Sequence, residues 1–440
     1  MSKLNKLIQE LCPNGVEYRK LGEIGEFENI GVDKKIVEGQ SLVKLLNYVD
    51  VYKNAHINNS LPQMIVSASD KKIEACTCEE GDIFLTPTSE TRDDIGHAAV
   101  VTETLSNTVY SYHIMRFRLT EKNMITSFFV RYLFETDIVQ KQIYKLAKGL
   151  TRYGLSKYDF AKLSIPLPPL PIQEEIVKIL DRFAEYTAEL QAELQARKEQ
   201  YEYYRNLLLT NNFAYGSADD KQKITGNARE EWKWMTLGEV GTFTRGNGLQ
   251  KKDFTESGVP CIHYGQIYTY YGTSTEKTKS FCSPDLARKL IKAKRGDLII
   301  ACTSENMDDV CKAVVWLGEE EIVTGGHSCV YEHKLNPKYV SYFFQTETFY
   351  AQKKKYARGT KVIDVKASDL AKIFIPVPPL SEQEHIVSIL DKFEALVSDL
   401  TQGLPAEIAA SQERYEYYRD KLIPRELREH AFLTVYFGGS

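Results

Sequence analysis

The chain has 440 residues, of which 43% are hydrophobic and 26% charged, and its formal net charge is −4. This length exceeds that of one ordinary domain and suits two or three domains, each with its own core. The composition is typical of water-soluble globular proteins, and the small excess of acids excludes a uniformly basic protein that coats nucleic acid.

The N-terminal residues, Met1 to Glu10, lack the apolar stretch of a secretory signal, and no apolar run reaches the roughly 20 residues of a membrane helix. We therefore expect a cytoplasmic protein. The eight cysteines include no Cys-x-x-Cys pair, and no segment has zinc-ligand spacing. Cys76 and Cys78 would point to opposite faces of a strand, which disfavours a shared ion. We expect buried free thiols and no metal site.

Residues 1–164 are predicted to form a first α+β domain with a curved sheet. Strand-like runs occur at 81–85 and 98–101, and residues 127–134 have a helical pattern. A basic segment near its end could bind phosphates, while nearby hydroxyl side chains could reach base edges. A solvated surface is the commoner explanation for one such segment taken alone. The candidate DNA-binding residues are Thr88, Ser89, Lys148 and Arg152.

Residues 165–212 are predicted to form a Pro-rich junction followed by a long central helix. Because proline lacks an amide donor and restrains the residue before it, we expect the junction to have no regular structure and to act as a rigid hinge. Apolar residues then recur every three or four positions from Ile172 to Leu208. About 36 helical residues would span roughly 54 Å. A helix of this length cannot bury its apolar stripe alone.

The second half of the chain repeats the first. The segment Ile165–Phe183 recurs as Ile375–Phe393, and Tyr201–Arg205 recurs as Tyr415–Arg419. The repeat predicts a second domain at 213–374, a junction and helix at 375–428 and a tail at 429–440. The second domain has strand-like runs at 297–300 and 313–315, a helical pattern at 339–344, and its own candidate DNA-binding residues, which are Thr303, Ser304, Arg358 and Lys361.

The helical segments match closely between the halves, whereas the domains diverge. We expect the two long helices to pack as an antiparallel coiled coil with the domains at opposite ends; the alternative is that each helix packs only on its own domain. The second helix carries about four extra residues, or one turn, and Gly403-Leu404-Pro405 predicts a break in it. Domains that bind different ligands do not need similar surfaces.

Catalytic motifs are scarce. The Asn/Asp-Pro-Pro-aromatic motif of amino-methyltransferases and the Gly-Lys-Ser/Thr phosphate loop are both absent. A nuclease-like Asp-x-Lys occurs at Asp364-Val365-Lys366, with Asp285 as a conceivable partner. The first half has Gly154-Leu155-Ser156 at the matching place, which favours a coincidence.

These features resemble the specificity (S) subunits of type I restriction-modification systems. A Leu-Gly-Glu opening (21–23 and 237–239), a Gly-Asp strand and a Pro-x-Pro-Pro-Leu helix entry with Gln-Glu and Leu-Asp each occur twice. The resemblance covers almost the whole chain. It implies two target-recognition domains separated by two long helices with a pseudo-twofold repeat, in a non-catalytic subunit that binds an asymmetric bipartite DNA site.

The resemblance also implies partners. Two methyltransferase (M) subunits would dock on the helices, and restriction (R) subunits would add a motor-nuclease. S-adenosylmethionine, ATP and Mg²⁺ would bind those partners, with no cofactor on this chain. The candidate interface residues are Gln173, Phe183, Tyr204, Gln383, Phe393 and Tyr418. The alternatives are a stand-alone DNA-binding or anti-restriction protein of the same fold, and an enzyme with an unrecognised active site.

Overall fold

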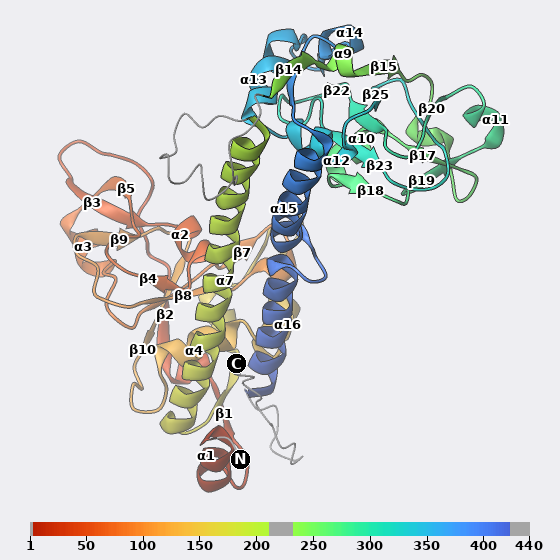
Figure 1. Cartoon of the computed structure of the whole chain (residues 1–440). Coiled ribbons are helices and arrows are strands. Elements are labelled where there is room, and N and C mark those ends of the chain that lie inside the picture. The colour runs from red at the N-terminus through yellow and green to blue at the C-terminus, as the bar shows by residue number, and fades with distance from the viewer. Residues whose placement is uncertain (1–2, 211–231, 423–440) are drawn as a thin grey trace, which may run out of the picture. The chain divides into compact units, whose positions relative to one another are not determined.

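The computed structural model describes residues 3–210 and 232–422, which fold as two compact units (Figure 1). Unit 1 comprises residues 1–189 and 408–440, and unit 2 comprises residues 190–407. Helix α7 (Leu170–Thr210) contributes to both units. Helix α15 (Leu380–Ser398) lies in unit 2, and α16 (Leu404–Leu422) lies in unit 1 from Ile408 onward. The expected tail at 429–440 and the start of the expected second domain, at 213–231, lie outside the described residues.

The domain of unit 1 is α+β, as its sequence predicts. A five-stranded sheet has the order β2-β10-β6-β8-β4, a three-stranded sheet has the order β5-β3-β9, and two smaller sheets join β11-β12-β7 and β1-β13. The elements are α1 (Lys3–Leu11), β1 (Glu17–Lys20), η1 (Leu21–Glu23), β2 (Gly25–Glu28), β3 (Ser41–Leu46), α2 (Tyr48–Lys53), β4 (His56–Ile57), β5 (Met64–Ala68), α3 (Asp70–Ala75), β6 (Ile83–Leu85), β7 (Thr88–Ser89), η2 (Arg92–Asp94), β8 (Ala98–Val101), β9 (Thr108–Tyr110), β10 (Met115–Leu119), α4 (Ser127–Phe134), α5 (Asp137–Leu146), β11 (Lys148–Gly149), β12 (Tyr153–Gly154), α6 (Lys157–Phe160) and β13 (Ser164–Leu167).

The domain of unit 2 repeats this plan. Its five-stranded sheet β15-β25-β21-β23-β18 matches that of unit 1, and the last pair of each, β18 with β23 and β4 with β8, is parallel. A second sheet has the order β16-β19-β17-β24-β20. The elements are β14 (Lys233–Thr236), α9 (Leu237–Val240), β15 (Gly241–Arg245), η4 (Lys251–Asp253), β16 (Phe254–Thr255), β17 (Val259–Ile262), α10 (Tyr264–Thr269), β18 (Ser274–Thr275), β19 (Ser280–Cys282), α11 (Pro284–Ala287), β20 (Ile291–Ala293), β21 (Leu298–Ala301), β22 (Thr303–Ser304), β23 (Ala313–Trp316), β24 (Ile322–Thr324), β25 (Ser328–His333), α12 (Pro337–Phe343), α13 (Glu347–Tyr356), β26 (Ile363–Asp364), α14 (Ala367–Leu370) and β27 (Phe374–Val377).

Each predicted strand and helix of the domains is present within two residues of its expected bounds, and the strand predicted at 98–101 and the helix predicted at 127–134 have those bounds. Thr126 is the N-cap of this helix, because its Oγ1 accepts a hydrogen bond from the Phe129 amide at 3.3 Å. All eight cysteines are buried free thiols, as expected. Cys76 and Cys78 follow α3 instead of lying on a strand, so the strand argument applied to them is wrong.

The Pro-rich junctions contain regular structure, which corrects the expectation from their sequence. Residues 164–167 form β13, which pairs antiparallel with β1 and places Pro166 opposite Tyr18. In unit 2, β27 pairs with β14 and places Pro376 opposite Trp234. Both ribbons have only two strands, so each proline sits on an edge strand, where its missing amide costs no ladder bond.

The long helices pack against each other within both units. In unit 1 the rings of Phe183 and Tyr418 stack with centroids 5.5 Å apart, and Thr187 Oγ1 lies 2.8 Å from Ser411 Oγ. Residue numbers rise along α7 as they fall along α16, so this packing is antiparallel, as predicted. Helix α7 also packs on the domain core of unit 1 through Ile172 and Ile176. The alternative of helices that pack only on their own domain is therefore wrong.

In unit 2, α15 takes the corresponding place beside α7, where Phe393 stacks on Tyr204 at 5.5 Å. The predicted break lies between Ser398 and Leu404. A Cβ atom on Gly403 would lie 2.5 Å from the Ala395 carbonyl oxygen, so the break between the two helices requires glycine.

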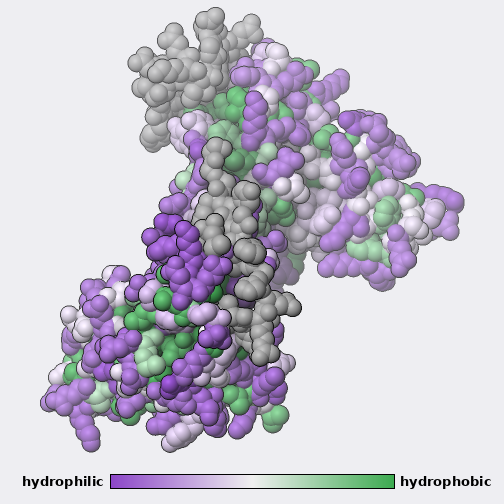
Figure 2. Space-filling model, turned by 90° about the horizontal axis from the view of Figure 1, so that it is seen from below, coloured by the Kyte–Doolittle hydropathy of each residue, from purple (hydrophilic) through white to green (hydrophobic). Residues whose placement is uncertain are grey.

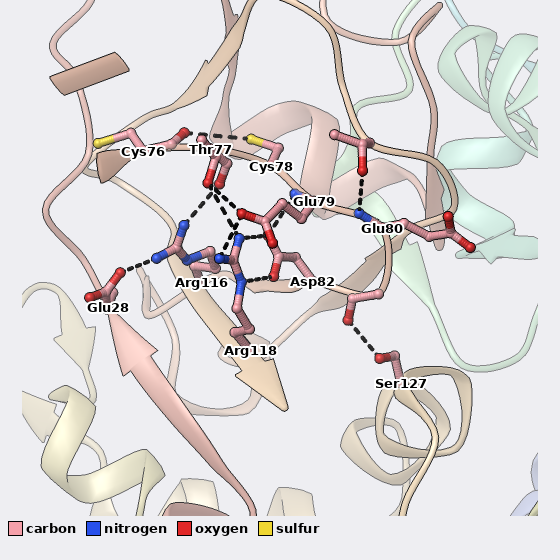
Figure 3. Close-up of polar contacts among 12 residues, drawn as sticks. Glu28, Cys76, Thr77, Cys78, Glu79, Glu80, Asp82, Arg116, Arg118 and Ser127 are labelled. Atoms are coloured by element: carbon pink, nitrogen blue, oxygen red, sulfur yellow. Dashed lines mark hydrogen bonds and ion pairs between the residues drawn. The ribbon is translucent and has the colours of Figure 1, made fainter. Parts of the chain in front are cut away.

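A partly buried ion-pair network ties β10 of unit 1 to the segment that precedes β6 (Figure 3). Arg118 binds Asp82 twice, with Nε–Oδ1 and Nη2–Oδ2 distances of 2.6 and 2.7 Å, and its Nη1 lies 2.9 Å from Glu79 Oε1. Arg116 pairs with Glu28 and donates to the Thr77 carbonyl at 2.9 Å. These residues connect strands of the unit. Because both guanidinium groups are paired with acids of the same unit, we do not count them among the candidate DNA-binding cations.

The face of the molecule in Figure 2 is largely hydrophilic, with apolar residues in small patches. Within residues 3–210 and 232–422, no helix is long and apolar enough to cross a membrane.

Candidate nucleic-acid interface

The basic segment of unit 1 folds as a small β-hairpin, residues 148–154, which we call the first hairpin. Lys148 pairs with Gly154, and Gly149 with Tyr153. Strand β12 continues the sheet to β7, where Gly154 pairs with Thr88. Arg152 Nη2 donates to Thr88 Oγ1 at 3.2 Å. The structure thus brings together the candidate residues from positions 88–89 and 148–152, and both cations are exposed.

Unit 2 builds the same feature from residues 358–364, the second hairpin. Arg358 bridges to Asp364, and β26 pairs with β22, which places Asp364 opposite Thr303. Arg358 and Lys361 are both exposed. The pairings match those of the first hairpin position by position, so the repeat extends to this substructure even though the domain sequences diverge.

One glycine shapes the turn of each hairpin. Gly149 has φ +147°, and a Cβ atom there would lie 1.9 Å from the Arg152 carbonyl oxygen. Gly359 has φ +105°, and its Cβ atom would lie 2.0 Å from the Val362 carbonyl oxygen. Any side chain at either position would collide with the opposite strand, so both turns depend on glycine.

The candidate hydroxyl residues lie under the hairpins. Ser89, Thr303 and Ser304 are 8%, 6% and 5% exposed, and Thr88 is half-buried. Ser89 Oγ donates to Asp94 Oδ2 at 2.7 Å, and Thr303 Oγ1 lies 3.0 Å from His327 Nδ1. Their hydroxyls are thus engaged within the protein, and contact of these residues with base edges stays a prediction.

A polar cluster that sequence reasoning missed supports the first hairpin. Asp94 accepts hydrogen bonds from Ser89, from Tyr52 at 3.1 Å and from His97 Nε2 at 2.9 Å. Burial would raise the pKa of Asp94, but these hydrogen bonds outweigh it and lower that pKa. Arg92 lies over the Tyr153 ring, 4.9 Å from its centroid. No sequence pattern links these residues, because Tyr52 and Asp94 are far apart in the chain.

The acid of the nuclease-like triplet has a structural partner. Asp364 Oδ1 lies 3.1 Å from Nη2 of Arg245, whose Nε donates to the Gly326 carbonyl at 2.9 Å. The conceivable partner Asp285 is exposed on α11 and pairs with Arg288. In the part of the chain that the structure describes, no three potential metal ligands gather. Asp364 thus holds the base of the second hairpin.

One lysine of α13, which precedes the second hairpin, is withdrawn from the surface. Lys353 is 4% exposed, and its Nζ donates to the Val310 carbonyl at 2.7 Å. Burial lowers the pKa of Lys353. Helix α13 turns Lys353 toward the core, whereas Lys354 and Lys355 are exposed.

Two candidate interface residues are buried inside their own units. Gln173 accepts a hydrogen bond from the Thr126 amide at 3.0 Å and donates to the carbonyls of Met124 and Pro168, both at 2.7 Å. Gln383 accepts from the Asn336 amide and donates to the Pro378 carbonyl, both at 2.8 Å. Each amide locks a helix entry onto its domain, and neither has surface free for a partner.

The four aromatic candidates pair with one another. Phe183 stacks on Tyr418 in unit 1, and Phe393 stacks on Tyr204 in unit 2. All four are half-buried. Elsewhere in unit 1, α7 presents charges of both signs to a shallow cavity of about 390 Å³, which is lined by Thr126, Phe128, Glu174, Val177, Lys178, Asp181, Arg182 and Glu185.

Comparisons with known proteins agree with this duplicated arrangement. The family described as type I restriction modification DNA specificity domain matches residues 13–218 and again 229–410. The chain is 33% identical over 280 residues to the type I restriction enzyme EcoR124I/EcoR124II specificity subunit of Escherichia coli, a match that covers 62% of this chain and 65% of that protein. The chain thus spans just under two thirds of that relative.

Two solved structures share the fold. The first comes from a structural study of complex assembly and conformational transition of the type I R-M system. It has a TM-score of 0.58 and 18% identity, and the match covers 94% of this chain and 98% of that chain. The other is the type I restriction-modification S subunit from M. genitalium, with a TM-score of 0.50 and 16% identity, covering 93% and 97%.

Proposed function

Because the chain belongs to the type I restriction-modification DNA specificity family, we propose that it is the sequence-reading subunit of such a system, itself without catalytic activity. It would bind duplex DNA at a site of two unlike half-sequences. It would also direct methyltransferase subunits, and a restriction motor-nuclease where one is present, to that site.

The two hairpins carry the proposal. Each exposes two cations at its edge and turn, Lys148 with Arg152 and Arg358 with Lys361, and cations so placed suit phosphate contacts. The hairpins share their backbone pairing but differ in side chains, as expected of two readers that use one scaffold for different sequences. A single DNA-binding module would have no use for this duplication.

The helices supply the proposed spacer. Helix α7 has 41 residues, so at 1.5 Å per residue it is roughly 60 Å long. A fixed helical scaffold would leave an unread stretch of about one turn of duplex, roughly 34 Å, between the half-sequences. Inserting or deleting one helical turn should change the spacer by about one or two base pairs and leave both half-sequences unchanged.

The partners and cofactors follow from the same proposal. Two methyltransferase subunits would dock on the repeated helical segments, because a surface that occurs twice suits two copies of one partner. S-adenosylmethionine would bind those subunits, and ATP with Mg²⁺ would bind the motor subunits. The sequence of this chain has neither the amino-methyltransferase motif nor a Gly-Lys-Ser/Thr phosphate loop.

Mapping of methylated adenines tests the function. The chain and its methyltransferase are expressed together in cells, and methylated adenines are mapped across the genome with and without the chain. We expect one asymmetric two-part motif that appears only when the chain is present. Methylation by the isolated chain would show an enzyme instead, and DNA binding without methyltransferase co-purification would show a stand-alone DNA-binding protein.

A further inference from the structure

The turn of the first hairpin carries an apolar side chain that is almost fully exposed. Leu150 is 94% exposed, the highest value among the exposed large hydrophobic residues of the described chain. It lies between Gly149 and the Thr151–Arg152 pair, with Lys148 at the base of the same hairpin. Residues 148–154 contain no acid. An apolar tip is thus flanked by two exposed cations.

The tip is held on a firm base. Strand β12 is paired on both sides, with β11 and with β7. Arg152 is tied to Thr88, and Arg92 covers the Tyr153 ring. The backbone of a turn held on such a base loses little further freedom on binding. A leucine in this setting has no structural role in its own unit.

The second hairpin lacks this feature at the matching position. The shared glycine turn aligns Leu150 with Thr360, and Lys361 and Val362 follow where the first hairpin has Thr151 and Arg152. Val362 is 56% exposed, but it corresponds to Arg152 and not to Leu150, so it does not lie at the tip of its hairpin. The two hairpins therefore share a backbone and differ in the chemistry of their tips.

Apolar side chains that enter a groove of DNA partially unstack a base step and bend the duplex, while neighbouring cations bind the phosphates on either side. We propose that Leu150 is such a wedge: it inserts at one base step within or beside the half-sequence bound by unit 1, and the hairpin of unit 2 leaves its half-sequence stacked. This inference rests on the proposed function and adds an asymmetric deformation of the DNA to it. The cations beside Leu150 favour DNA over an apolar protein surface as its partner.

The test uses the complex of the chain with its methyltransferase and a duplex of the mapped sequence. Single 2-aminopurine bases, which fluoresce more strongly when unstacked, are scanned through both half-sequences and the spacer. Because a methyltransferase extrudes its target adenine from the duplex, the target adenine of each half-sequence is left unlabelled. Among the remaining positions we expect one to brighten severalfold on binding, in one half-sequence only. Leu150→Thr, which installs the residue of the second hairpin, should remove this signal and raise the Kd about tenfold.

The reciprocal variant Thr360→Leu should create a second bright position in the other half-sequence, whereas Val362→Ala should leave the wild-type pattern unchanged. The fold of each variant is checked by circular dichroism, and little change is expected because these side chains are exposed. Brightening that survives Leu150→Thr, or its absence in a bound wild-type complex, overturns the wedge and leaves the proposed function standing. Loss of methyltransferase assembly in Leu150→Thr with unchanged DNA stacking also overturns it. A wild-type complex that does not bind the mapped duplex overturns the proposed function itself.

Discussion

The Gly-Asp strand that occurs in both repeats offers an internally controlled test of what holds each unit together. Asp82 and Asp297 occupy matching positions and are 1% and 5% exposed. Asp82 binds Arg118 through both carboxylate oxygens. Asp297 accepts the Lys294 amide at 2.8 Å, and the residue that corresponds to Arg118 is Glu332. Neutralising the two carboxylates should therefore have opposite consequences.

For Asp82→Asn we expect a marked loss of stability in unit 1. Removing one partner of a buried ion pair costs about 3–5 kcal/mol. Arg118 is 31% exposed and would still pair with Glu79 at 2.9 Å. Solvent screening and this second partner reduce the expected loss of unfolding free energy to about 2–3 kcal/mol. For a unit of this size that corresponds to a fall in Tm of about 5–10 °C.

For Asp297→Asn we expect an unchanged or higher stability of unit 2. Burial, followed by repulsion from Glu332, raises the pKa of Asp297. Between the ordinary carboxyl pKa and this raised value, the folded state holds more protons than the unfolded state, so the contribution of Asp297 to stability falls as the pH rises. Asparagine carries no charge, so it removes this unfavourable contribution to stability at neutral pH. Its side-chain oxygen can still accept the hydrogen bond from the Lys294 amide.

The three tryptophans, Trp232, Trp234 and Trp316, all lie in unit 2, so their fluorescence reports the unfolding of that unit, and hydrogen exchange of peptides from β6 and β10 reports unit 1. Asp82→Asn should speed exchange in unit 1 without moving the fluorescence midpoint, and Asp297→Asn should leave exchange in unit 1 unchanged. Equal destabilisation by the two variants, or a fully stable Asp82→Asn, would refute the reasoning.

Three further predictions concern the helix entry, the pH response and the hairpins. Gln173→Leu should destabilise unit 1 by about 2–4 kcal/mol, because it leaves three buried backbone groups without partners; hydrogen exchange at the start of α7 measures it, and unchanged protection would contradict it. Burial lowers the pKa of His333 to about 4, so the unfolded state binds more protons than the folded state between there and its usual value near 6.5. Tryptophan fluorescence should thus show unit 2 losing stability as the pH falls through this window, and His333→Phe should flatten the response. Arg152→Ala and Lys361→Ala should each reduce the slope of log K against log salt by about 0.9, if each cation binds one phosphate; binding titrations at several salt concentrations measure it, and unchanged slopes would show that the hairpins do not contact the backbone.

The repeat, the long helices and most domain strands were predictable because their signals are local. A 3.6-residue apolar period, two-residue alternation and the duplicated segment at Ile165 and Ile375 can be read from neighbouring residues. The break at Gly403-Leu404-Pro405 was also local, since glycine and proline restrict the backbone wherever they stand. For the same reason the basic segments at 148–152 and 358–361 were found in advance.

What those segments do depends on pairing between residues far apart in the sequence. Only the tertiary structure brings Thr88 beside Arg152, turns Lys353 inward and commits the Gln173 amide to backbone groups near Met124. It also provides the strand that accepts Pro166 on its free edge. Backbone preferences act over a few residues, whereas burial and hydrogen-bond partners are decided by how distant strands come together. The sequence by itself therefore determined the duplicated plan of this protein, and the three-dimensional packing decided which of its polar and charged side chains remain at the surface.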